Sequence, residues 1–244
     1  MGSAWWWWQH AALTLAGACT DVVVRSGGVI TGLRVTMVVS SLVVEEGGVI
    51  HSDGTSTATT GTASHSYIGA SHGGQAALSD VLPYGSVANP TDVGSKPSVN
   101  TNYGGGAIHI TAAGGATVDG RVSADAVYLN HHQGGGSGGS VLLSAGSVHG
   151  SGAIHARGNR GRMGATASGG SGGRVAVKAS SLGSTFSGSI DAKGGETDSS
   201  LPVRVVCCRG RGAQAMFTRW ELCDVCMCRT GAWWYRLLGC SRRP

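Results

Sequence analysis

Gly138-Gly139-Ser140-Val141-Leu142-Leu143 is one of three closely similar stretches in this chain, and their spacing decides the predicted fold. The other two are Gly104-Gly105-Gly106-Ala107-Ile108-His109-Ile110 and Gly172-Gly173-Arg174-Val175-Ala176-Val177. The spacing is nearly constant, at about 33–34 residues from Gly106 to Gly139 and again from Gly139 to Gly173. Each stretch is followed by a second short apolar segment, at residues 117–122, 147–154 and 185–190. A regular period of this length indicates a repeat architecture in which neighbouring units bury a shared core.

Alternation of side chains within these copies predicts strands. Ile108 and Ile110 should face one way and His109 the other. Residues 22–200 show no 3.6-residue apolar period, which argues against a βαβ fold because its crossovers need helices. We therefore predict an all-β fold, a parallel β-helix or β-solenoid of Gly-rich repeats of about 33–36 residues each, with irregular N- and C-terminal flanks. An irregular Gly-rich sandwich is the alternative.

Glycine is unusually abundant, at 43 of 244 residues, but it follows no Gly-X-Y period and therefore does not indicate collagen. Hydrophobic residues make up 41% of the chain and fall in short runs, which disfavours disorder. The Gly runs at 134–139 and 169–173 are interpreted as corners, where φ is positive or backbones approach closely. They are not interpreted as phosphate-binding loops, because strands rather than helices should follow them.

The chain divides into regions of different composition. Residues 1–21 are interpreted as a signal peptide or a misassigned start. Residues 22–200 form the Gly-rich body, in which 22–54 resemble a first, looser copy. Ile50 and the matching Val122 are about 72 residues apart, or about two periods, so 55–103 should take the place of one repeat as a long insertion or surface loop. Residues 201–244 form an Arg/Cys/Trp-rich tail, interpreted as unstructured or as not genuine coding sequence.

Charge and cysteine are concentrated in that tail. Residues 203–244 carry eight Arg and two acidic residues, a net charge of +6, which leaves 10 basic and 11 acidic residues, a net charge of −1, in residues 1–202. The neutral body gives no reason to expect nucleic acid as its partner, although a nucleic-acid-binding tail is a further alternative. The weak candidate metal ligands of the chain are four tail cysteines, Cys223, Cys226, Cys228 and Cys240. No transmembrane segment and no cofactor are expected.

A resemblance follows from the repeat pattern. The order Gly-Gly-x-apolar-x-apolar, then x-Gly-x-Ile-x-Ala-x-Gly, resembles the glycine-rich, pectin-lyase-like β-helix repeats of large surface proteins in bacteria and unicellular eukaryotes. Residues 84–95 also resemble a stretch that recurs between such repeats, and the similarity covers residues 26–196. The resemblance implies an extracellular or cell-surface stalk and assigns no catalytic residues.

The sequence contains no catalytic constellation. Between Gly104 and Gly195 the only acidic residues are Asp119, Asp125 and Asp191, and they form no adjacent pair of the kind that glycosidic cleavage needs. We therefore predict a non-enzymatic structural or adhesive module, part of a longer protein, whose partners are cell-surface glycans or other proteins. Self-association through exposed strand edges is also expected. The alternative is a carbohydrate-binding or carbohydrate-cleaving β-helix module.

The histidines are interpreted as exposed polar positions. His51, His109 and His155 each follow an isoleucine, so each should point to solvent. Stacking of the repeats in register would bring His109 and His155 together on one face, which is the basis of an alternative metal or pH-sensitive site. His131 and His132 form a further pair.

Overall fold

A computed structural model describes residues 12–16, 20–98, 102–128, 134–161, 167–181 and 184–196, together with two short strands between residues 228 and 235. Strands are the only regular secondary structure in these residues. Runs of Val, Ile and Thr favour extended backbone because β-branched side chains pack well on a pleated surface. In chain order the strands are β1 (Ala12–Ala16), β2 (Asp21–Val24), β3 (Val29–Thr31), β4 (Arg34–Val39), β5 (Ser41–Val44), β6 (Val49–His51), β7 (Asn102–Tyr103), β8 (Ala107–Val118), β9 (Arg121–Ser123), β10 (Val127–Tyr128), β11 (Ser140–Gly150), β12 (Ala153–His155), β13 (Arg174–Ala179), β14 (Thr185–Phe186), β15 (Ser189–Asp191), β16 (Cys228–Thr230) and β17 (Trp233–Tyr235).

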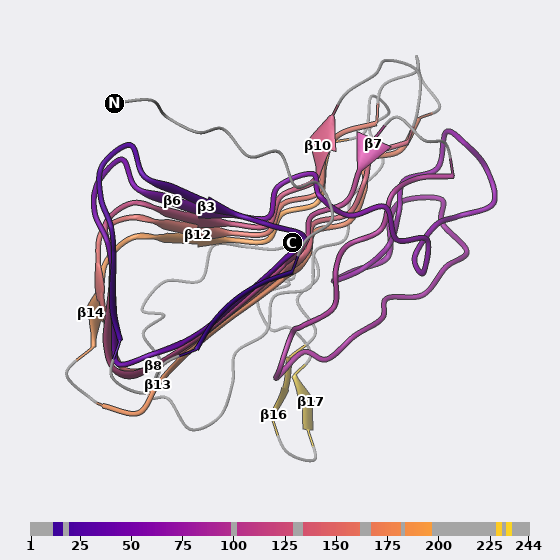
Figure 1. Ribbon diagram of the computed structural model, residues 1–244. Helices are drawn as coiled ribbons and strands as arrows, with labels where there is room; N and C mark the ends of the chain where they lie inside the picture. The colour runs from indigo at the N-terminus through magenta and orange to yellow at the C-terminus, as the bar shows by residue number, and fades with distance from the viewer. Residues whose placement is uncertain are drawn as a thin grey trace, which may run out of the picture.

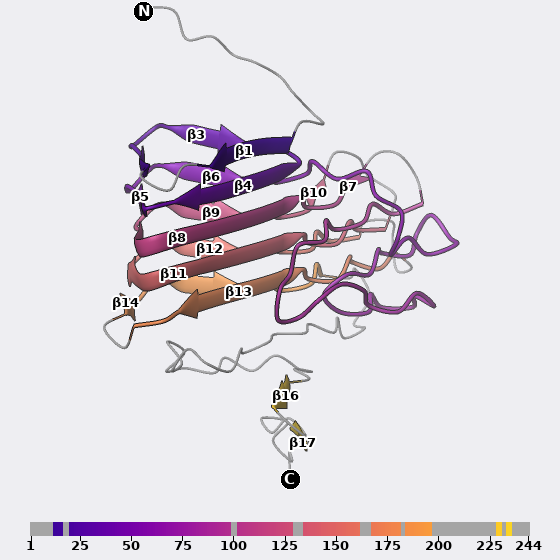
Figure 2. The same ribbon diagram turned by 60° about the horizontal axis from the view of Figure 1, so that its bottom comes forward.

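Most of these strands form two parallel sheets that face each other across the core (Figure 1). The larger sheet has eight strands in the order β1-β4-β8-β11-β13, with β2, β5 and β14 pairing alongside this path. The smaller sheet has five strands in the order β3-β6-β9-β12-β15. Figure 2 shows the strands of both sheets as flat, regularly spaced layers. The pairs β7–β10 and β16–β17 are antiparallel.

The core between the sheets consists of columns of apolar side chains contributed by successive paired strands. Each of the following is at most 1% exposed: Met37, Ile110 and Leu143 in one column, and Ile50, Val122 and Ile154 in another. Ile108 is fully buried as well, whereas His109 between Ile108 and Ile110 is partly exposed. The predicted facing of these three residues is therefore confirmed.

The prediction of a parallel β-helix or β-solenoid with repeats of about 33–36 residues is wrong. The strands form flat, stacked parallel sheets, as in α/β proteins, but without helices in the described residues, and no single repeat length runs through them. In the small sheet, Val29 pairs with Val49 after about 20 residues, and Val49 pairs with Arg121 after about 72 residues. Arg121 pairs with Ala153 after about 32 residues, and Ala153 pairs with Ser189 after about 36 residues. A parallel ladder constrains which residues pair, whereas the connection between them can have almost any length.

Two further expectations are corrected by the same pairings. Residues 22–54 do not form one looser copy, because β2 and β3 already pair with β5 and β6 inside this segment. Residues 55–103 do not take the place of a repeat, since β4 pairs directly with β8 and β6 with β9. The described part of that segment instead extends sideways from the sheets, at the right of Figure 1.

We call this lateral region the wing; it comprises the described residues within 52–106, 124–139 and 156–173. Its segments stack through backbone hydrogen bonds, such as Gly105 N–H to the Ser137 carbonyl (3.0 Å) and Gly138 N–H to the Ser171 carbonyl (3.0 Å). Ser137 and Ser171 are fully buried. The Ser137 hydroxyl accepts the Ser95 N–H at 2.7 Å, so buried polar contacts help to hold the wing together.

Of the two roles considered for the Gly runs, close approach of backbones is correct for Gly139. A Cβ on Gly139 would lie 1.8 Å from the carbonyl oxygen of Gly106, a distance that no side chain tolerates. Positive φ is found elsewhere, for example at Gly27 (76°) and Gly47 (79°), which lie in tight turns between strands. No residue of 134–139 has a positive φ, so close approach of backbones is the one of the two roles that this run fulfils.

Candidate functional site

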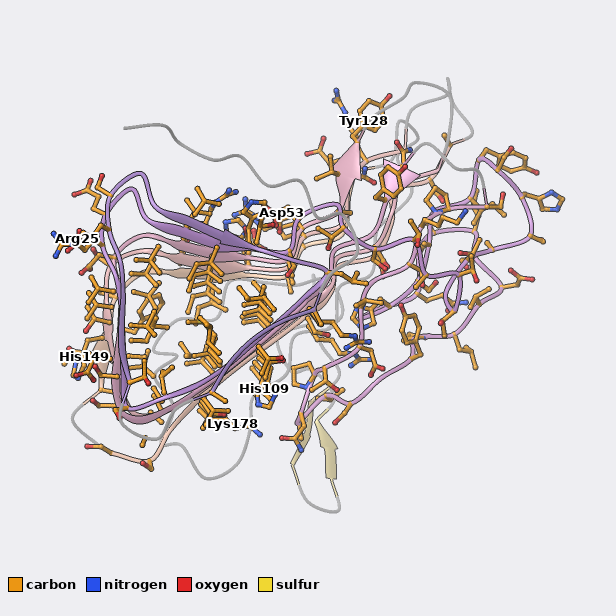
Figure 3. All side chains as sticks on the ribbon, viewed as in Figure 1. Arg25, Asp53, His109, Tyr128, His149 and Lys178 are labelled. Carbon is orange, nitrogen blue, oxygen red and sulfur yellow. The ribbon has the colours of Figure 1, made fainter. Side chains whose placement is uncertain are left out.

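A row of charged and imidazole side chains follows the carboxyl ends of the small-sheet strands. Because the strands are parallel, residues at their ends meet along the same edge of the sheet. Asp53 marks the position of this row on the outer side of the small sheet in Figure 3. We call this set the charged row; its members at or just after the carboxyl ends are His51, Asp53, Asp125, His155, Arg157 and Asp191, and Arg121 joins them from the start of β9 through its contact with Asp53.

Asp53 joins β6 to the next strand of the small sheet. Its Oδ1 accepts the backbone N–H of Asp125 at 2.8 Å, and its Oδ2 accepts the hydroxyl of Ser123 at 2.9 Å. The Nη1 atom of Arg121 lies 3.4 Å from the same Oδ2. Both oxygens of this carboxylate are therefore occupied by groups of the protein.

Asp125 repeats the arrangement one strand further along. Its Oδ1 accepts the backbone N–H of Arg157 at 2.7 Å. The Nδ1 of His155 lies 2.9 Å from Oδ2 and 3.1 Å from Oδ1, and it must carry the proton because a carboxylate only accepts. Arg157 in turn donates from Nε to Oδ2 of Asp191 at 2.7 Å. The charged row is thus a chain of contacts that links successive strands.

Opposing effects act on the imidazole of His51. Burial lowers its pKa, nearby Asp53 opposes this, and Arg121 lowers the pKa further. The backbone N–H of Asp53 points to its Nδ1 at 3.4 Å, as expected for an unprotonated ring nitrogen. His51 therefore contributes a neutral imidazole to the row.

The row lacks a free pair of acid and base groups for covalent chemistry. Glycosidic cleavage needs one carboxyl to donate a proton and a second to act as base or nucleophile. Asp53 and Asp125 lie on adjacent layers, but both accept backbone N–H groups and face a cation or an imidazole. Within the described residues, no group of three or more His, Cys, Asp or Glu side chains is arranged to hold a metal ion.

A second polar cluster lies where the wing covers the outer face of the large sheet. Arg174 of β13 is 7% exposed and donates from Nη2 to the carbonyls of Tyr84 (2.7 Å) and His72 (3.3 Å). The ring of His72 packs against that of Tyr84, with centroids 4.6 Å apart. His72 Nδ1 contacts the Gly138 carbonyl at 2.7 Å, so the neutral ring carries its proton on Nδ1.

Burial dominates the electrostatics of this cluster. It lowers the pKa of His72 to about 4; the hydrogen bond to Gly138 opposes the shift, and the charge of Arg174 adds to it. The Nε2 atom of His72 is buried and has no hydrogen-bond partner among the described residues. Burial also raises the pKa of Tyr84 to about 12. Because His72 is fully buried, this cluster fastens the wing to the sheet and offers no surface to a ligand.

The structure separates the histidines that the sequence grouped. His109 lies on β8 in the large sheet and His155 on β12 in the small sheet, so the expected joint face is wrong. His155 is only 5% exposed because Asp125 covers it, and its predicted solvent exposure is also wrong. The pair His131 and His132 lies outside the described residues.

Sequence reasoning missed Asp53, His72 and Arg174 as members of polar clusters. A weak signal existed for the charged row, since Asp53, Asp125 and Arg157 all stand two residues after a strand-ending position. No local signal could have paired His72 with Arg174, because 102 residues separate them. The candidate metal ligands Cys223, Cys226 and Cys240 lie outside the described residues, and of Cys228 only the backbone, at the start of β16, is described.

The chain matches no family model, no curated protein and no solved structure. In the described residues there is no helix long and apolar enough to cross a membrane.

Proposed function

We propose that this protein is a non-catalytic structural or adhesive module of the cell surface or extracellular space. Its partners would be surface glycans or other proteins. One observation carries the proposal: the carboxylates of Asp53, Asp125 and Asp191 are used to link strands. Charged groups committed to each other in this way support a rigid scaffold better than an active site, where a reacting group must be free to exchange a proton.

The composition of the wing supports the same proposal. It is built from stacked Gly and buried Ser, and the side chains of Tyr84 and His72 are used for internal contacts. The outer face of the large sheet is partly covered by the wing, since Arg34 Nη1 donates to the Thr91 carbonyl at 2.7 Å. These contacts favour a fixed surface for binding or spacing.

A carbohydrate-cleaving module is the second candidate, and one observation favours it. Asp53 and Asp125 lie on adjacent layers, with Arg121 beside them, at the outer side of the small sheet. Such a site would have to break the existing hydrogen bonds of both carboxylates before reaction. The scaffold proposal needs no such rearrangement.

The decisive experiment exposes the full chain to a panel of neutral and acidic polysaccharides. Binding is measured by biolayer interferometry, and cleavage by the release of new reducing ends. We expect no cleavage by the wild type or by Asp125→Asn. Cleavage that disappears in Asp125→Asn, while far-UV circular dichroism shows that the variant is still folded at the assay temperature, would refute the proposal and establish the second candidate.

A further inference from the structure

The two ends of the stacked sheets present the same kinds of residue in the same columns. In the small sheet, one column runs Ile30, Ile50, Val122, Ile154 and Ile190 through the paired strands. The three inner members are at most 1% exposed, whereas Ile30 and Ile190 at the two ends are only partly buried. Burial of the column is therefore complete for its three inner members and incomplete for the member at each end.

The large sheet shows the same pattern. Its matching column runs Leu15, Met37, Ile110, Leu143 and Val177. Leu15 and Val177 are again only partly buried, while the members between them are fully buried. Val29, which precedes Ile30 on the edge strand and lies outside this column, is 58% exposed. An apolar column whose last side chain is only partly buried leaves hydrophobic area in water at each end.

The backbone at both ends is also able to continue the sheets. Among the described strands, β3 and β15 each pair on one side only, as the terminal strands of the small sheet. In Figure 2 the end with β1 and β3 lies opposite the end with β13 and β14. All strands of both sheets are parallel, so a second copy placed in the same orientation presents its β3 to β15 of the first. Both strands are three residues long, as Val29–Thr31 and Ser189–Asp191.

Side chains at such a junction are compatible. Continuing the registers places Ile190 next to Ile30 and Val177 next to Leu15 of the second copy. Asp191 lies in the column of paired residues that starts at Thr31. Its carboxylate would therefore meet the Thr31 hydroxyl of the second copy and not a second carboxylate. Lys178 falls in the column of Ala16, so no like charges oppose each other across the junction.

We propose that copies of this chain associate head to tail, with β15 of one copy pairing with β3 of the next and β13 pairing with β1. This contact joins two different surfaces, so it leaves one free end on each side and can repeat. The inference goes beyond the proposed function and does not depend on it, because a glycan-cleaving protein could assemble in the same way.

The test uses the full chain and two variants that each block one end, Ile30→Lys and Ile190→Lys. Sedimentation velocity of the wild type should show a series of oligomers that lengthens with concentration. Each variant alone should be monomeric, because a lysine would have to desolvate its charge in the junction. An equimolar mixture should form dimers and nothing larger, since each variant supplies the intact end that the other lacks.

Controls separate assembly from folding. Leu82→Lys, at a wing position that is 71% exposed, should leave the oligomer series unchanged. Circular dichroism and melting temperature establish that each variant folds; if the isoleucine variants do not, Val29→Lys and Ser189→Lys place charges on the same edge strands at exposed positions. A wild type that stays monomeric, a dimer that never grows, or single variants that fail to complement each other would each overturn the proposal. The first of these results would arise if the chain's own terminal segments cover the ends.

Discussion

His72 should make this protein less stable as the pH is lowered. The ring is fully buried within the wing, and its Nδ1 donates to the Gly138 carbonyl at 2.7 Å. The charged groups that face it are Arg174, which donates to its carbonyl oxygen, and Asp92, whose charge weakly favours protonation. A proton added at the buried Nε2 would find no acceptor there among the described residues.

The size of the effect follows from the pKa of His72. Burial lowers it from the ordinary 6.5 to about 4 in the folded protein. Between these two pH values the unfolded chain binds a proton that the folded protein does not, so acidification favours unfolding. The shift corresponds to about 3 kcal/mol at 1.36 kcal/mol for each pH unit. This stability is fully present above pH 6.5 and is lost as the pH falls towards 4.

The perturbation is His72→Asn, because the asparagine amide can still donate to Gly138 but does not titrate. Losing the ring contact with Tyr84 should destabilise the variant by about 0.5–1.5 kcal/mol at pH 7. Because only the wild type loses about 3 kcal/mol as the pH falls from 6.5 to 4, the order should reverse, and the variant should be the more stable protein by about 2 kcal/mol at pH 4.

Urea unfolding monitored by circular dichroism, at a series of pH values, measures both curves. His149→Asn controls for the removal of an exposed imidazole, since the contact of His149 with Thr185 lies at the surface. Parallel curves for wild type and His72→Asn across this pH range would refute the reasoning, because they would show that His72 does not resist protonation in the folded state.

Two further predictions concern the stacking of the layers. Gly139→Ala should lower the free energy of unfolding by about 3 kcal/mol or more, because its Cβ would lie 1.8 Å from the Gly106 carbonyl oxygen. In the same urea titration, Gly115→Ala should lower it by less than about 1 kcal/mol, because the nearest atom to its Cβ would be the rotatable Ser147 hydroxyl, at 3.2 Å. Asp125→Asn should lower the free energy of unfolding by about 1–3 kcal/mol through loss of its charge-assisted hydrogen bonds, and Asp119→Asn, whose contacts lie at the surface, by less. Equal losses within either pair of variants would contradict these explanations.

The sequence was a good guide to local geometry and to the pairing of three strands. The Gly-Gly starts at 105–106, 138–139 and 172–173 were aligned correctly, because Ala107 pairs with Ser140 and Ser140 with Arg174. It was a poor guide to the number of layers between residues 12 and 54. In that segment, paired strands of successive layers are only about 20 residues apart in the chain. A repeat length of about 33–34 residues, expected from the later copies, therefore counted two layers as one.

The candidate site was predictable only in part. Asp119, Asp125 and Asp191 were recognised as the acidic residues of residues 104–195 and as lacking an adjacent partner. Asp53 was missed because its partner Asp125 is 72 residues away, and that distance includes the whole of segment 55–103. The exposed interpretation of His155 was wrong because alternation predicts which way a side chain points, not what covers it.

By itself, the sequence determined that this protein consists of short strands with alternating faces, since period-two patterning and β-branched residues act within a few neighbours. Only the tertiary structure decided that the strands form two flat parallel sheets with unequal connections, that Gly139 serves close backbone contact, and that the charged row links the layers. The physical reason is that these features depend on residues 20 to 102 positions apart, whose meeting is set by sheet register and by burial.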